Sequence, residues 1–195
     1  MPALLCGLVA LALSGGLVGG CTPRAKSPRE AWERFVHAVA SKDGKALYAA
    51  LDLETRWSWM SVRRAQREAY DILLSNLPPG PVRDRQLRRF ETGALADDEA
   101  ALFAASMTPA RWDDLAGDVP ASASALAPAA AGPNEATVKT GSGRTFLLKR
   151  GQDGGWGFAG FAAEAEDLKQ RAGTDLDLVR TNTADFERAA TRAGR

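Results

Sequence analysis

The sequence predicts an α+β protein in which N-terminal helices pack on a small antiparallel sheet and a C-terminal helical extension follows. Three observations lead to this fold class. Residues 27–118 contain capped segments with apolar residues at helical spacing. Residues 135–161 alternate apolar and polar positions between glycine-rich turns. Helical spacing then returns from residue 162 onward, and no internal repeat is present.

The first predicted helix has a strong start signal. Ser27 can cap it, Pro28 suits its first turn, and Glu30 completes a capping box. Its apolar stripe consists of Trp32, Phe35, Val36 and Val39. A turn at residues 41–44 leads to a short second helix, and a longer third helix is expected over residues 55–76 because prolines follow.

The middle of the chain is less regular. Residues 82–107 have a helical pattern, and Thr108-Pro109 begins a further helix that carries Trp112. Residues 119–133 are rich in alanine, proline and serine, which predicts an exposed connector.

The C-terminal third begins with strands. Two turn sequences, GSGR and GQDGG, separate three short segments, which predicts a hairpin or a three-stranded meander. The three segments are residues 135–140, 144–150 and 156–161. Two helices are expected after them, over residues 162–171 and 174–192, with Leu176, Leu178, Val179, Phe186 and Ala189 at apolar positions of the second.

Two stretches resemble envelope lipoproteins of the nuclear transport factor 2-like superfamily. Residues 27–53 have its opening helix, Lys/Gly/Asp turn and short second helix, and residues 135–161 place an Asp-Gly turn before a tryptophan. The resemblance implies a cystatin-like roll, a curved antiparallel sheet wrapped on helices. It also implies an apolar cavity in the roll, which some members use for catalysis, while others bind there or only dimerise.

The N-terminal residues resemble a targeting signal. Residues 1–20 contain no charged side chain and form an apolar run of signal-peptide length. Val18-Gly19-Gly20-Cys21 resembles the lipobox of bacterial lipoproteins, which implies cleavage before Cys21 and a diacylglyceryl group on its sulfur. An ordinary secretory signal and a buried N-terminal helix are the alternatives.

This interpretation divides the chain into a signal peptide (1–20), a lipidated cysteine with a short tether (21–26) and one α+β domain (27–195). The five tether residues after Cys21 reach at most about 18 Å. We therefore expect the membrane to be a partner through Cys21, with the domain held close to the headgroups.

The composition excludes several chemistries. With 25 Lys+Arg and 24 Asp+Glu the net charge is +1, which gives no basis for nucleic-acid binding. Once Cys6 leaves with the signal and Cys21 is acylated, no thiol remains for a disulfide or a metal. The single histidine, His37, falls on the polar side of its helix, and the glycines of GWGFAG (155–160) lie within a strand instead of a phosphate-binding turn. No catalytic, metal or cofactor residue, and no cofactor, is predicted.

Candidate contact residues come from two patterns. Arg83, Arg85, Arg88 and Arg89 form a basic cluster, and Arg63, Arg64 and Arg67 form another; each is read either as a solvated face or as an anionic-surface contact. Trp57 cannot share a helix face with Trp59, so it is a candidate for membrane or partner contact, with core packing as the alternative.

The resulting functional expectation is a membrane-anchored lipoprotein of the bacterial cell envelope, periplasm-facing or at the surface, that binds an unknown small ligand or envelope protein without catalysis. A structural or assembly role through an exposed surface is the alternative, and an enzyme using the roll cavity is the third. An aromatic-lined cavity would favour ligand binding. A filled core with an apolar exterior patch near Trp57 or the C-terminal helices would favour assembly.

Overall fold

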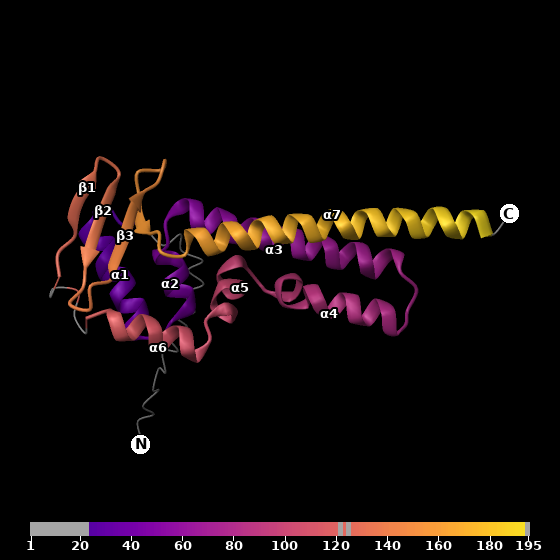
Figure 1. Cartoon of the computed structure of the whole chain (residues 1–195), viewed down its shortest axis with the longest axis horizontal. Coiled ribbons are helices and arrows are strands. Elements are labelled where there is room, and N and C mark those ends of the chain that lie inside the picture. Colours follow the sequence, from indigo (N-terminus) through magenta and orange to yellow (C-terminus); the bar gives the residue numbers. More distant parts are fainter. Residues whose placement is uncertain (1–23, 121–122, 124–125, 194–195) are drawn as a thin grey trace, which may run out of the picture.

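The computed structural model describes residues 24–120, 123 and 126–193, and the predicted signal peptide and Cys21 lie outside them. This part of the chain is α+β: six helices precede a four-stranded antiparallel sheet in the sequence, and one helix follows it. Figure 1 shows two regions. The head contains the sheet with α1, α2, α5 and α6, and the arm is formed by α3, α4 and α7, which run together away from the head.

Four short helices build the head: α1 (Pro28–Ala40), α2 (Gly44–Ala50), α5 (Glu99–Ser106) and α6 (Pro109–Asp118). The predicted cap of α1 is confirmed, because Ser27 Oγ accepts the Glu30 N–H at 3.2 Å. Glu30 reaches back one residue further than a capping box, since its Oε2 accepts the Lys26 N–H at 2.7 Å. Side chains cap each of the four helices at its start.

The sheet is a meander of β1 (Ala129–Gly132), β2 (Glu135–Lys139), β3 (Thr145–Arg150) and β4 (Trp156–Phe158). The predicted three strands are present, but β1 lies inside the stretch predicted to be a connector. Ala129 pairs with Thr137 across β1 and β2. The prediction missed β1 because all four of its residues are exposed, so the strand has backbone pairing but no apolar alternation.

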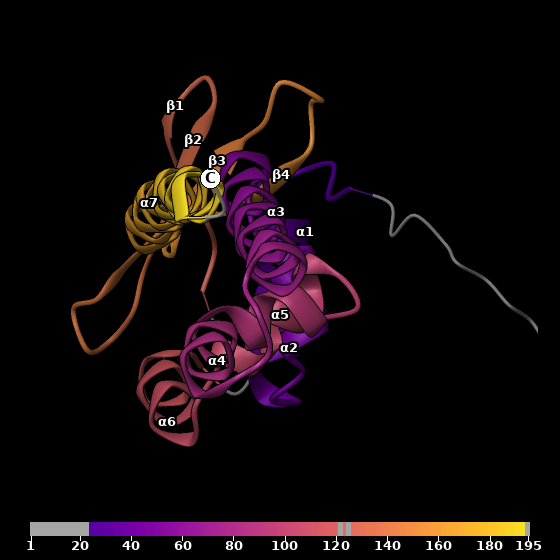
Figure 2. The ribbon, with the colours of Figure 1, turned by 90° about the vertical axis from the view of Figure 1, so that its right-hand side faces the viewer.

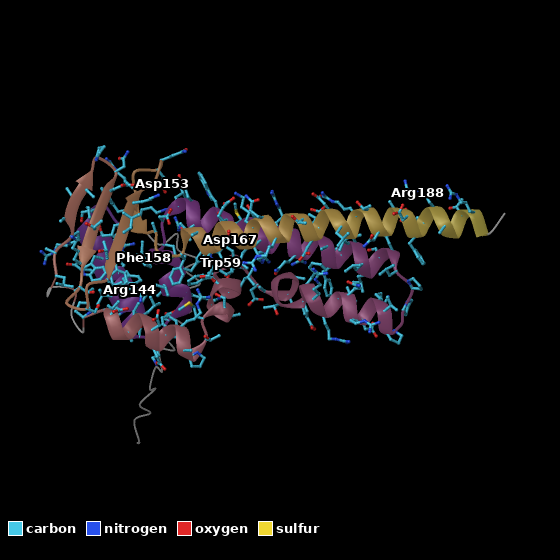
Figure 3. All side chains as sticks on the ribbon, viewed as in Figure 1. Trp59, Arg144, Asp153, Phe158, Asp167 and Arg188 are labelled. Carbon is cyan, nitrogen blue, oxygen red and sulfur yellow. The ribbon has the colours of Figure 1, made fainter. Side chains whose placement is uncertain are left out.

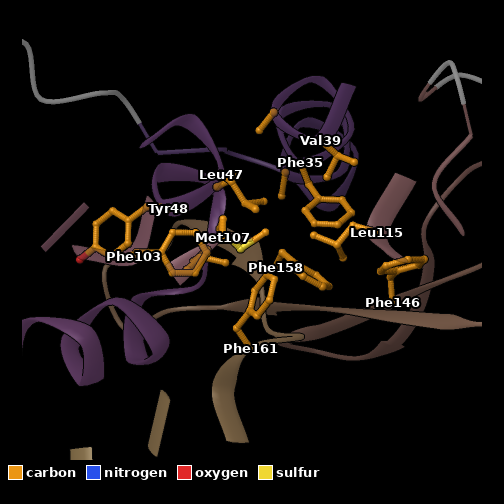
Figure 4. Close-up of a cluster of buried hydrophobic side chains, with 14 of the residues drawn as sticks. Phe35, Val39, Leu47, Tyr48, Phe103, Met107, Leu115, Phe146, Phe158 and Phe161 are labelled. Carbon is orange, nitrogen blue, oxygen red and sulfur yellow. The ribbon is translucent and has the colours of Figure 1, made fainter. Parts of the chain in front are cut away.

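Aromatic rings fill the space between α1, α2 and the inner face of the sheet (Figure 4). The centroid of Phe35 lies 4.1 Å from Phe158 and 5.5 Å from Phe146. Phe103 continues the cluster, with its centroid 5.5 Å from that of Phe161. Trp32, Trp59 and Trp112 are buried as predicted, and Trp156 is half-buried.

The arm consists of α3 (Leu53–Asn76), α4 (Pro81–Leu95) and α7 (Ala162–Ala193). With 32 residues, α7 is about 48 Å long, and its last turns extend past the other two helices (Figure 1). The arm has its own small core of Ala69, Leu73, Phe90, Leu176 and Val179.

The prediction of two helices after the sheet is wrong, because α7 runs through Gly173 without a break. A glycine inside a helix costs about 1 kcal/mol relative to alanine. Burial of Ala172 and Leu176 on either side of Gly173 offsets that cost. None of the helices in the described part of the chain is both long enough and apolar enough to cross a bilayer.

Candidate functional site on the head and arm surfaces

The first described residues are fixed to the sheet. Ala25 is only 3% exposed, and its carbonyl accepts the Trp156 N–H at 2.9 Å in an antiparallel bridge. Arg24 Nε lies 3.0 Å from Asp153 Oδ2 in the turn before β4 (Asp153 is labelled in Figure 3). A side chain at Gly155 would collide with Arg24, because its Cβ would lie 2.7 Å from the Arg24 Cβ.

This attachment corrects the predicted tether and domain boundary. Residues 24–26 belong to the folded head, so the described domain begins before residue 27. Arg24 follows Cys21 by three residues, and three residues span at most about 10 Å.

Trp57 is exposed, as the contact interpretation requires. It lies on α3 with 45% of its surface accessible, whereas its neighbour Trp59 is buried against Phe103. In Figure 2, viewed along the arm, α7 and α4 lie on one side of α3. The helical spacing of Trp57, Met60, Arg64 and Arg67 places these residues on the side of α3 that faces away from α4 and α7.

The structure does not gather the four arginines of the α4 cluster into one basic surface. Arg89 crosses to α7, where its Nη2 lies 2.7 Å from Asp175 Oδ1. Arg83 is half-buried, with Nε 3.9 Å from Asp84 Oδ1. Arg85 and Arg88 are exposed, and within the described residues neither forms an ion pair.

The other basic cluster is also divided. Arg63 Nη2 donates hydrogen bonds to the carbonyls of Ala96 and Asp97, both at 2.9 Å, and so ties the end of α4 to α3. This is a structural role. Arg64 stays exposed beside it, and no ion pair forms at Arg64 within the described part of the chain.

A groove of about 160 Å³ lies between the three arm helices. Its apolar lining consists of Leu73, Leu77, Val82, Leu178 and Val179. Val82 and Leu178 are strongly exposed, the latter at 50%, and Phe186 is exposed further along α7. The remaining lining residues are polar: Gln86, Arg89, Asp175, Asn182 and Thr183. The arm groove, as we call it, is therefore a mixed exterior surface with an apolar strip on α7.

A second depression, between α6 and the sheet, has its charges paired. Arg111 contacts Glu164, and Arg144 Nη1 lies 3.2 Å from Asp114 Oδ2 and also contacts Asp118. Hydrogen bonds from Arg144 and Ser142 lower the pKa of Asp118. Because each guanidinium has a carboxylate partner, this depression offers no free cation to an anionic ligand.

The buried titratable groups are structural. Burial raises the pKa of Asp52, which is 4% exposed and caps α3 by accepting the Thr55 N–H at 3.4 Å and the Thr55 hydroxyl. Burial also raises the pKa of Tyr48, whose hydroxyl donates to the Arg56 carbonyl. His37 lies exposed on α1. No three His, Cys, Asp or Glu side chains of the described residues group closely enough to hold a metal ion.

Comparisons with protein-family models, curated proteins and solved structures returned no match. The site is therefore argued from the geometry of this chain alone. Sequence reasoning missed Met60 and Val82 as exposed apolar residues, and it placed Leu178 and Phe186 on a packed face. A helical wheel of residues 53–76 would have found Met60, because it falls beside Trp57 and away from the buried stripe.

Proposed function

We propose that this protein is a lipid-anchored cell-envelope protein that acts without catalysis, by binding a partner protein through the arm groove. The lipobox-like Val18–Cys21 segment supports the anchor. The nuclear transport factor 2-like roll stays part of the proposal for the head, supported by an antiparallel meander packed on α1. A periplasm-facing or surface location follows from the same signal.

One observation carries the choice of an external binding surface: the inner face of the sheet is packed with side chains. The rings of Phe35, Phe146 and Phe158 lie in mutual contact there, where a ligand-binding roll would have its cavity. Two depressions of the described residues, of about 670 Å³ along α3 and about 690 Å³ between α3 and α7, lie outside the sheet.

The arm groove has the chemistry of a protein-docking surface. Exposed Val82 and Leu178 form its apolar rim, and burying an apolar side chain of this size contributes about 1.5–3 kcal/mol. Arg85 follows Val82 by one helical turn, is exposed, and forms no ion pair with any other described residue. The complementary partner presents apolar side chains flanked by a carboxylate.

Site-specific cross-linking in bacterial cells that produce the full chain tests this surface. A photo-reactive residue at Leu178 should give one dominant product with an envelope protein, and the same residue at exposed Lys139 on β2 should not. Val82→Glu, a change at an exposed position, should abolish the Leu178 product. Equal products at both positions, or persistence with Val82→Glu, would contradict the proposed surface.

The anchor is tested separately by mass spectrometry of the N-terminal peptide and by cell fractionation. We expect an acylated Cys21 as the first residue and membrane-bound protein. Cys21→Ser should remain unacylated and leave the membrane fraction. A Cys21→Ser chain that is processed normally and still fractionates with membranes would refute anchoring.

The enzyme alternative requires His37 or a carboxylate pair in a pocket. His37 projects from the exposed side of α1, and the carboxylates of the α6 depression are paired with arginines. These observations favour binding over catalysis as the function to test first.

A further inference from the structure

The outer face of α3, defined by Trp57, Met60, Arg64 and Arg67, is an exposed mixed surface. Trp57 and Met60 are 45% and 48% accessible, which is unusual for two large apolar side chains one helical turn apart. Arg64 and Arg67 follow along the same face. Arg67 Nε is 4.0 Å from Asp71 Oδ2, and an exposed pair at that distance is weak.

The described chain begins on the same side as this face. In Figure 2 the indigo residues before α1 project from the side of α3 that faces away from α7 and α4. Their position is fixed, because Arg24 is bound to Asp153 and Ala25 to Trp156. A membrane anchor on Cys21 would therefore hold Arg24 within about 10 Å of the bilayer, on the side of the molecule to which the outer face of α3 also belongs.

We infer that the outer face of α3 lies on the membrane surface, in the headgroup region of an anionic bilayer. This inference rests on the proposed acylation of Cys21. The residue types fit the interface: a tryptophan ring is favoured at headgroup depth, Met60 adds apolar area, and arginines pair with lipid phosphates. An open depression beside Met60 leaves room for headgroups. It is rimmed by Arg64 and Arg67 and also by Glu68, Asp71 and Glu99, so the two arginines are the groups there that would pair with lipid phosphates.

The same geometry argues against the α4 arginines, which the sequence suggested as candidate membrane contacts. In Figure 2, α4 lies on the opposite side of α3 from the first described residues. An attachment of three residues between Cys21 and Arg24 brings α3 to the bilayer and leaves Arg85 and Arg88, on α4, directed away from it. The outer face of α3 then contacts lipid, while the arm groove remains free for a partner protein.

Two single-cysteine variants of the full acylated chain provide the test. Met60→Cys and Leu178→Cys replace apolar residues of nearly equal exposure, 48% and 50%, on opposite faces of the arm. Each is labelled with an environment-sensitive dye and reconstituted in vesicles of mixed anionic and zwitterionic phospholipid. Far-UV circular dichroism confirms that both variants are folded.

A quencher attached to the lipids should reduce the emission of the Met60 label strongly and that of the Leu178 label little. Adding Arg64→Gln or Arg67→Gln, each of which removes one positive charge, should shift the orientation equilibrium about five-fold in anionic vesicles, and far less in neutral ones. If α3 lay near the bilayer without its arginines contacting the headgroups, this charge dependence would not be seen.

Other outcomes separate the two proposals. If Cys21 is acylated and the protein floats with vesicles, but both labels are quenched equally or not at all, the inference about α3 fails and anchoring stands. A Met60 label that is shielded without lipid quenching would instead indicate a second copy of the chain on this face, which also overturns the inference. An unacylated Cys21 overturns the proposed function, and this inference with it.

Discussion

The head and the arm are stabilised in different ways. In the head, helices and sheet enclose a continuous aromatic cluster around Phe35 and Phe103. In the arm, the second cluster of the described residues has only five buried members, with partly buried side chains around them. Exposed ion pairs such as Arg89–Asp175 and Arg180–Glu68 link α7 to its neighbours. Exposed ion pairs contribute little, typically less than about 1 kcal/mol each.

This difference teaches where the molecule can open. A region with few buried apolar contacts opens locally at a lower free energy than one with a dense core. We therefore expect the arm to open without the head, while loss of the head core unfolds both. The following predictions test this comparison.

Phe35→Ala should have the largest effect. The Phe35 ring is fully buried and packs on three other aromatic rings, so its removal should lower the free energy of unfolding by about 4 kcal/mol. Urea unfolding followed by tryptophan fluorescence and circular dichroism measures the change. Phe186→Ala, at an exposed position on α7, is the matched control and should have almost no effect. Similar losses of unfolding free energy from both variants would mean that burial of Phe35 in the head core does not stabilise the protein more than the exposed Phe186 does.

Phe90→Ala should open the arm alone. Phe90 is buried in the arm core, and its truncation should cost about 3 kcal/mol, which lowers protection against hydrogen exchange about 100-fold. The affected amides should be those of α4 and of the adjoining turns of α3 and α7. Hydrogen exchange by mass spectrometry would locate them. Equal loss of protection in α1 and β3 would show that the two regions unfold as one unit.

Two glycine-to-alanine changes should have opposite signs. At Gly157 in the head, an added Cβ would lie 2.5 Å from the Asp52 backbone, so Gly157→Ala should destabilise by about 2 kcal/mol. At Gly173 in α7, nothing lies within 4 Å, so Gly173→Ala should stabilise by about 1 kcal/mol. Thermal and urea unfolding measure both. If Gly173→Ala destabilised the arm, a bend at that residue would be part of the fold.

Asp52→Asn should change how stability depends on pH, by a smaller amount. Burial raises the pKa of Asp52, so its folded state holds the proton more tightly than the unfolded state. The corresponding stability is present below the ordinary pKa and is lost as pH rises through the raised one. Asparagine keeps the capping oxygen without titrating. Relative to Asp52→Asn, the unchanged protein should therefore weaken as the pH rises above the ordinary pKa of an aspartate.

Urea unfolding of the two chains at a series of pH values measures this difference. Glu30, Asp118 and Glu166 have lowered pKa values, so they act with the opposite sign, but they are common to both chains and cancel. A difference that is flat with pH would mean that Thr55 fully compensates the buried charge.

The sequence predicted the elements whose signals are local. Ser27 and Pro28 marked the start of α1 because capping involves only neighbouring residues, and the GQDGG turn marked β3 and β4 in the same way. The cap of α3 by Asp52 was missed, although Asp52 followed by Thr55 is a capping spacing. The predicted fold class was therefore correct, with α3 beginning two residues earlier than expected.

What could not be predicted depends on distant partners. β1 exists only because Ala129 meets Thr137, and α7 continues through Gly173 only because α3 packs along it. The sequence could not tell whether Trp57 is buried or exposed, because this depends on which side of α3 packs against α4 and α7. The arm groove was hidden for the same reason, since Leu178 fits an apolar stripe equally well whether or not a helix lies opposite.

The bridge between Ala25 and Trp156 joins residues 131 positions apart, and so connects the first described residues to the last described strand, β4. Closing so long a loop carries an entropic cost that only the finished fold repays. Ala25 can therefore be held in place only once β4 has formed, so the completed sheet sets the direction in which the chain enters the domain.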